Sequence, residues 1–145
     1  MSGVHAVLAV AVLVTNLLAG AWGGIAWLRR EPSVVFWYLL RVAQVVVVIQ
    51  VMIGMMLLGS SRRAPAPLHV LYGIAPLVVA LVSEAMRVGA AQRELAGVDD
   101  VEALEREQQA EIARRVVRRE MGIMAVGALL IVTLALRAAG TGGLF

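Results

Sequence analysis

Four long apolar runs, separated by polar segments, constrain this chain more than any other feature of its sequence. They cover about residues 4–28, 34–58, 68–86 and 121–139. Each run reaches the roughly 17–25 residues that a helix needs to cross the hydrocarbon layer of a bilayer. Because lipid offers no hydrogen-bond partner to an open strand edge, each span must be helical. The sequence therefore predicts an all-α fold: an integral membrane four-helix bundle forming a single transmembrane domain over residues 1–145.

The composition agrees with a membrane environment. Hydrophobic residues make up 61% of the 145 residues and charged residues 16%, whereas soluble domains are roughly 45–50% apolar. A soluble fold of this length could not bury so much apolar surface. The lack of cysteine excludes disulfides and Cys-ligated metals. The arginines cluster at the ends of apolar runs rather than along a basic stripe with aromatics, so we expect no nucleic-acid partner.

Arginines in the connections predict how the chain crosses the membrane. The first connection carries Arg29 and Arg30, and the third carries seven more. Basic residues are enriched in cytoplasmic loops, so these two connections are expected in the cytoplasm and both termini outside it. Arg62 and Arg63 in the second connection argue against this orientation. We expect a multi-pass protein of the cell inner (plasma) membrane.

The third connection, about residues 88–120, is the large polar segment of the chain. It is expected to form a charged cytoplasmic helical segment that extends the fourth helix beyond the membrane. Gly97 is expected to end one element, and Asp99 or Asp100 to cap the next helix. The segment could dock on a partner or fold back onto Ala90–Leu95.

Charged side chains of this segment are expected to pair along the helix and to bind lipid. Glu102 with Arg106, and Glu111 with Arg115, have the i,i+4 spacing that stabilises a helix. Basic residues beside a span bind anionic headgroups, at about 1 kcal/mol each. The lipid-headgroup residues predicted in this way are Arg114, Arg115, Arg118 and Arg119.

Polar residues within the spans fall on stripes when each residue advances by about 100°. Because such residues are costly in lipid, the stripes are expected to face one another inside the bundle. The first span has His5, Asn16 and Gly23 on its stripe. The stripe of the second span contains Arg41, Gln44, Val48, Met52 and Met55. In the third span the stripe is His69, Tyr72, Pro76, Ala80, Ser83 and Arg87, with Glu84 beside it.

Arg41 and Glu84 are each expected about one turn inside the cytoplasmic end of their spans. Because they then lie at the same depth in the membrane, we expect an ion pair between them, with Gln44 beside it. The predicted buried polar cluster as a whole contains Arg41, Gln44, Glu84, Arg87, Asn16 and Tyr72. One interpretation is that these residues fix the register between helices, as polar residues in membrane bundles commonly do. The other is a proton or quinone site built on Glu84.

The two histidines, His5 and His69, are expected near the outer face on neighbouring stripes. Two histidines at one level of a bundle could be the axial ligands of a b-type haem. The alternative of a copper site would add methionines of the second span, which are Met52, Met55 and Met56. The simplest interpretation is an interfacial histidine pair with methionines that pack, and therefore no metal. Gly20 and Gly24 form a GxxxG step that serves packing within one chain or dimerisation.

The segment Leu68-His69-Val70-Leu71-Tyr72-Gly73 follows a short polar loop that contains Pro65 and Pro67. Here the chain resembles small, largely uncharacterised multi-pass proteins of high-GC bacteria, whose third span opens with a similar Leu-His-x-Leu-Tyr phrase. The resemblance covers about Phe36–Arg87. It implies a four-helix membrane protein and no particular activity.

No sequence motif for catalysis is present: the chain has no Walker loop, no GxGxxG and no HExxH. We therefore expect a non-catalytic accessory or structural subunit of a larger membrane complex, respiratory or photosynthetic, with other subunits or a second copy as partners. One alternative is a redox protein that binds haem or quinone through His5 and His69. A second is a small dimeric transporter or channel with Arg41, Glu84 and Asn16 on its pathway.

Overall fold

The computed structural model of the chain describes residues 2–60, 66–98 and 100–141. Within them the chain forms four helices: α1 (Ser2–Arg29), α2 (Val34–Ser60), α3 (Pro67–Leu95) and α4 (Arg106–Thr141). All four are long and apolar enough to cross a membrane. The predicted all-α, four-helix bundle is confirmed, as is the extension of the fourth helix beyond its apolar run.

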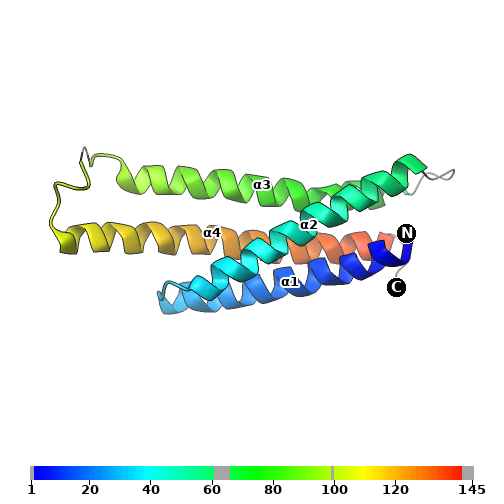
Figure 1. Cartoon of the computed structure of the whole chain (residues 1–145), viewed down its shortest axis with the longest axis horizontal. Helices are drawn as coiled ribbons and strands as arrows, with labels where there is room; N and C mark the ends of the chain where they lie inside the picture. Colours follow the sequence, from blue (N-terminus) through cyan, green and yellow to red (C-terminus); the bar gives the residue numbers. More distant parts are fainter. Residues whose placement is uncertain (1, 61–65, 99, 142–145) are drawn as a thin grey trace.

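The helix α4 lies between α1 and α3 and packs on both (Figure 1). The helix α2 crosses the other three diagonally, packing mainly on α1 and only lightly on α3. Each helix runs antiparallel to the one before it, so the start of α1 and the end of α4 lie together (Figure 1). We call this the terminal end of the bundle.

Small residues at the contacts of α4 with α1 and α3 allow these helices to pack closely. A Cβ atom added at Gly20 of α1 would lie 2.7 Å from Cδ2 of Leu129, so these two helices touch closely. A Cβ added at Gly127 would meet the hydroxyl of Ser83 on α3. Gly24, the second glycine of the GxxxG step, has no atom within 4 Å of its Cβ position. The step therefore contributes one close contact within the chain, through Gly20.

The inner faces of α1 and α3 agree with the predicted stripes. Asn16 and Gly23 of α1 are buried, as are Pro76, Ala80 and Ser83 of α3. The stripe predicted for α2 to face inward is wrong at Arg41, Val48, Met52 and Met55, which are exposed.

The buried face of α2 is one residue away from the predicted one and consists of Phe36, Leu40, Ala43 and Val47. These residues recur every three or four positions and form a continuous apolar stripe. The ring of Phe36 fills the space that Gly23 leaves open. Since apolar side chains fill the interior, Arg41 and Gln44 are displaced to the edge of α2 that faces α3.

The helices α3 and α4 share one antiparallel register along their whole length. His69 contacts Ala138 at the terminal end, Arg87 contacts Glu120, and Glu94 contacts Arg115 at the other end. From Glu120 to Thr141, α4 measures roughly 30 Å at 1.5 Å per residue, which matches the hydrocarbon thickness of a bilayer. Residues 88–98 and 100–119 lie beyond this level, and the part nearest the α3–α4 connection extends past the end of α1; we call these residues the stalk (Figure 1).

The stalk is divided into two helical parts, in agreement with the break expected at Gly97. It consists of the end of α3, a connection, and the start of α4 at Arg106. Gly97 has a φ of 89° and follows the end of α3, as predicted. Arg62, Arg63 and Asp99 lie outside the described residues.

The predicted start of the last helix at Asp100 is wrong. The Asp100 carboxylate accepts a hydrogen bond from the backbone N–H of Glu102 at 2.9 Å, which closes a local turn instead. The side-chain amide of Gln109, in the first turn of α4, donates a hydrogen bond to the backbone carbonyl of Leu104 at 2.9 Å. Glu102 therefore precedes the helix and, within the described ranges, forms no ion pair with Arg106. The predicted pair of Glu111 with Arg115 is present at 3.0 Å.

We expect Gly127→Ala to destabilise the bundle by about 1–3 kcal/mol, because the added methyl group overpacks against Ser83. The thermal unfolding midpoint, followed by circular dichroism in mild detergent, measures the effect. Adding Ser83→Ala to this variant should recover part of the loss. The matched control is Gly140→Ala, whose Cβ position has no atom within 4 Å and which should not lower the midpoint. Equal midpoints for Gly127→Ala and the control would contradict the tight α3–α4 contact.

Candidate functional site

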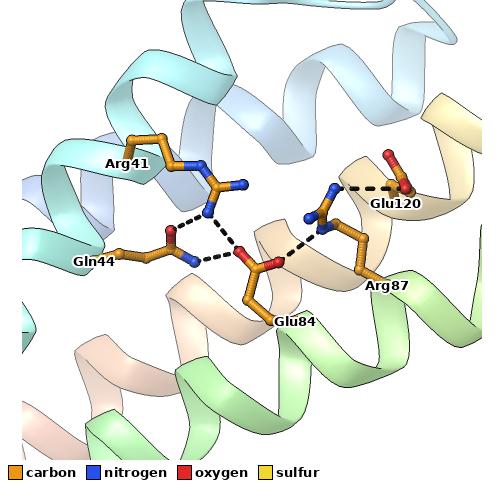
Figure 2. Close-up of polar contacts among 5 residues, drawn as sticks. All are labelled: Arg41, Gln44, Glu84, Arg87 and Glu120. Atoms are coloured by element: carbon orange, nitrogen blue, oxygen red, sulfur yellow. Dashed lines mark hydrogen bonds and ion pairs between the residues drawn. The ribbon is translucent and has the colours of Figure 1, made fainter.

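A polar network joins α2 to α3 about one helical turn inside the level of Glu120 (Figure 2). The Nη1 atom of Arg41 donates to Oε1 of Glu84 at 2.7 Å and to Oε1 of Gln44 at 2.6 Å. The Gln44 amide nitrogen donates to the same Glu84 oxygen at 2.8 Å. The structure thus brings together Arg41, Gln44 and Glu84, the three residues predicted to pair.

Arg87 continues the network from α3 to α4. Its Nε donates to Oε2 of Glu84 at 2.8 Å, and its Nη1 lies 3.6 Å from Oε1 of Glu120 (Figure 2). The guanidinium group of Arg87 also lies over the ring of Trp37, 5.7 Å from its centroid, in a cation–π contact. Two arginines and two glutamates therefore balance one another, so the network carries no net formal charge.

The remaining two members of the predicted cluster lie elsewhere. Asn16 is fully buried in α1, where its amide donates to the carbonyl of Val12 in its own helix at 2.9 Å. Tyr72 lies near the start of α3 and lines a cavity at the terminal end. The Asn16 amide is bonded within its own helix, and Tyr72 lies about three turns from Glu84, so neither belongs to the network.

Glu120 and Trp37 belong to the network although the sequence reasoning did not include them. A signal for Glu120 was present: the third apolar run ends directly before Arg87, and the fourth begins directly after Glu120. In an antiparallel pair both residues then lie at the same membrane level, close enough to form an ion pair. No comparable signal identifies Trp37, since its contact depends on how α2 crosses α3.

Two of the four predicted headgroup arginines hold the stalk together. Arg119 Nη1 lies 2.9 Å and Arg115 Nε 3.5 Å from the carboxylate of Glu94. Ala90 and Ile112 are buried nearby, so α4 folds back onto the end of α3, one of the two options that the sequence allowed. Arg114 and Arg118 line a shallow hollow together with Arg30 from the end of α1.

A second candidate site lies at the terminal end, where all four helices enclose a cavity of about 360 Å³. Most of its wall is apolar and includes Val12, Val47 and Ala135. The polar residues that line it are His5, Gln50, His69 and Tyr72. The ring centroids of the two histidines are 6.3 Å apart, so the predicted proximity of His5 and His69 is correct.

The two histidines differ in how their rings are held. The Nδ1 of His69 lies 3.0 Å from the carbonyl oxygen of Ala138, which can only accept, so Nδ1 carries the hydrogen. In the neutral ring the other nitrogen of His69 is then an acceptor. The ring of His5 lies against α2, where a Cβ added at Gly54 would be 3.2 Å from its Cε1. Its Nε2 faces the amide nitrogen of Gln50 at 3.4 Å.

Some polar atoms in the wall of the cavity have no hydrogen-bond partner in the described structure. Within the described part of the chain, Nδ1 of His5 and Oε1 of Gln50 are buried without a hydrogen-bond partner. Turning the Gln50 amide would pair its oxygen with Nε2 of His5 and would still leave His5 Nδ1 without a partner. Buried orphan atoms cost free energy, and their position beside a cavity indicates a site that can gain hydrogen bonds from a ligand.

The residues do not fit a haem held between the two histidines. An axial ligand must direct a nitrogen lone pair at the iron, with room for the macrocycle beside the ring. The Nε2 of His5 instead faces Gln50, and Cε1 of its ring lies 3.2 Å from the position that a Cβ atom would take at Gly54. The Nδ1 of His5 has no partner among the described residues, but it is buried against α2 beside Gly54 and has no room for a macrocycle there, so the pair does not fit a haem.

The methionines also do not gather for a copper site. Met55 lines the cavity with the histidines, whereas Met52 and Met56 are exposed on the outer surface of α2. In the described residues, no group of three or more His, Asp or Glu side chains is placed to hold a metal ion.

Comparisons with protein families, with curated proteins and with solved structures give no match for this chain.

We expect Glu84→Ala to destabilise the protein by about 2 kcal/mol, because Arg41 and Arg87 lose their shared carboxylate in a poorly hydrated position. The measurement is the shift of the thermal unfolding midpoint in mild detergent. Glu111→Ala is the control, since the exposed Glu111–Arg115 pair should contribute less than about 1 kcal/mol. If both variants unfold at the same temperature, the network does not join α2 to α3 energetically.

Proposed function

We propose that this protein binds a lipid-soluble carbonyl compound of the quinone class in the cavity at the terminal end. The observation that carries the proposal is an apolar cavity with four polar side chains on its wall, two of which have unpaired buried atoms. Ligand pockets have volumes of roughly 300–1,000 Å³, and this cavity falls in that range. A quinone matches such a wall because its ring is apolar and its two oxygens require hydrogen bonds.

The polar groups suit both oxidation states of such a ligand. The carbonyl of a quinone needs a donor, and the Tyr72 hydroxyl and the Gln50 amide can each donate. The hydroxyl of a quinol needs an acceptor, and neutral His69 offers its Nε2 because Ala138 holds the other nitrogen as a donor. The binding of both forms supports a role in membrane electron transfer.

We expect Tyr72→Phe and Gln50→Leu each to weaken binding of a short-chain ubiquinone about tenfold, since each removes one hydrogen bond. Both substitutions keep the approximate shape of the side chain, and calorimetric titration in mild detergent measures the dissociation constant. The matched control is Met56→Leu, on the exposed face of α2 outside the cavity. An unsaturable wild-type titration, or wild-type affinity in both cavity variants, would refute the proposal.

We also propose that the stalk lies in the cytoplasm and that the terminal end lies outside it, in the cell inner (plasma) membrane. Arg29 and Arg30 lie at the same end of the bundle as the stalk and its arginines (Figure 1). Basic residues near span ends favour the cytoplasmic side, which supports this orientation.

The absence of cysteine permits a direct test of orientation. In Ala103→Cys the thiol is at an exposed position of the stalk, and in Gly140→Cys it is at an exposed position of the terminal end. A membrane-impermeant maleimide added to intact cells should label Gly140→Cys and leave Ala103→Cys unlabelled until the cells are opened. The reverse pattern would mean that the orientation is inverted.

A second candidate function is that of a non-catalytic accessory subunit of a larger membrane complex. The observation that favours it is the stalk, a paired-helix extension whose outer surface carries exposed Glu107, Glu111 and Arg118 beyond the bundle. Such a surface is suited to docking a second protein. Purification from native membranes in mild detergent after crosslinking should retain that partner, and recovery of the chain alone would remove this candidate.

A further inference from the structure

The helices α2 and α3 diverge toward the start of α2 (Figure 1), and polar side chains connect them near Arg41; we call this exposed region of the two helices the wedge. The helix α2 crosses the bundle diagonally and is supported there mainly by α1 and α4 (Figure 1). The direct links from α2 to Glu84 of α3 are the hydrogen bonds of Arg41 and Gln44 (Figure 2). Long polar side chains therefore provide the link between α2 and Glu84 of α3 at this level.

Arg41 is the outward-facing end of the network. Its side chain is 52% exposed, against 27% for Glu84 and 24% for Arg87. Both of its hydrogen bonds use the Nη1 atom, so among the described residues its Nε and Nη2 donors have no partner. Glu84 is shared with Arg87, and therefore compensates the charge of Arg41 only in part. The exposed edge of the wedge is thus electropositive and has spare donors.

The depth of this edge suits a lipid phosphate. Glu84 precedes Arg87 by one helical turn, about 5 Å, and Arg87 lies at the level of Glu120, where the roughly 30 Å apolar section of the bundle begins. An arginine side chain at this depth reaches the headgroup layer by extending along the helix. In a bilayer, spare guanidinium donors at this level face the phosphodiester groups of lipids.

The surface deeper in the wedge is apolar. Val48 lies two turns from Arg41 along α2, and Leu81 lies one turn from Glu84 along α3, both toward the terminal end. Both side chains are exposed. A molecule with an anionic head and an apolar tail therefore matches the wedge from its charged edge inward.

We propose that one phospholipid occupies the wedge between α2 and α3, with its phosphodiester on Arg41 and its acyl chains over Val48 and Leu81. The planar guanidinium group binds phosphate oxygens through two donors in a fixed geometry, which a lysine cannot reproduce. The lipid would stabilise the crossing of α2 over α3 and satisfy the donors that Glu84 does not use.

The test is native mass spectrometry of protein extracted in mild detergent from vesicles of phosphatidylglycerol and phosphatidylcholine. The wild-type chain should retain one phospholipid, with a saturable dependence on added lipid. Arg41→Gln should weaken this binding about tenfold, as expected for the loss of a charged hydrogen-bond donor pair. Arg41→Lys, which keeps the charge, should show an intermediate loss.

The control is Arg93→Gln, in the stalk, where the bond that Arg93 makes within the described residues goes to the carbonyl of Gly89 in its own helix. It should retain lipid as the wild type does. Circular dichroism identifies any variant that has lost its helices. If Arg41→Gln has lost them, the lipid retention of Arg41→Lys compared with that of Arg93→Gln tests the proposal. Equal lipid retention by the Arg41 variants and the control would overturn the proposal. Displacement of the lipid by millimolar inorganic phosphate would also overturn it, since the site would then bind a free anion.

Discussion

Hydrocarbon provides no hydrogen-bond partner for a peptide group and little solvation for a charge, and both facts shape this molecule. Backbone groups are satisfied within four helices, each long enough to cross the membrane. Near the stalk end of the apolar section the ionised side chains are paired, as Arg41 and Arg87 are with Glu84. The small residues of α4 then allow three helices to pack in one layer, with α2 lying across them.

The two ends of the bundle have different chemistry as a result. At the stalk end many side chains are charged, and opposite charges pair between α3 and α4. Glu94 of α3, for example, pairs with Arg115 and Arg119 of α4. At the terminal end, His5, Gln50, His69 and Tyr72 line a cavity, and two of them have buried polar atoms without a partner in the described residues. Fully paired charges stabilise an arrangement of helices, whereas neutral groups with unmet hydrogen-bonding capacity favour the binding of a ligand. The site proposed for a quinone therefore lies at the end without ion pairs.

The diagonal course of α2 links these features. At its start, Phe36 packs into the space beside Gly23, which fixes α2 on α1 and α4. From this position Arg41 and Gln44 reach Glu84 of α3 through hydrogen bonds. At its end, α2 brings Gln50 and Gly54 to His5 and forms one wall of the cavity. The same crossing accounts for both the polar wedge and the cavity.

The sequence alone determined the four spans, the pairing of Arg41 with Glu84, and the proximity of His5 to His69, because each follows from span length and from depth along a helix. Depth is set by residue number in a membrane helix, so residues at one level can be recognised without a structure. Rotation about the helix axis and crossing angle are not set in this way. Only the tertiary structure decided that Phe36 rather than Met52 faces inward, that Asn16 and Tyr72 stand apart from the network, and that the ring of His5 turns toward α2. Those outcomes depend on how side chains of particular shape fill the space between helices, which no single helix specifies.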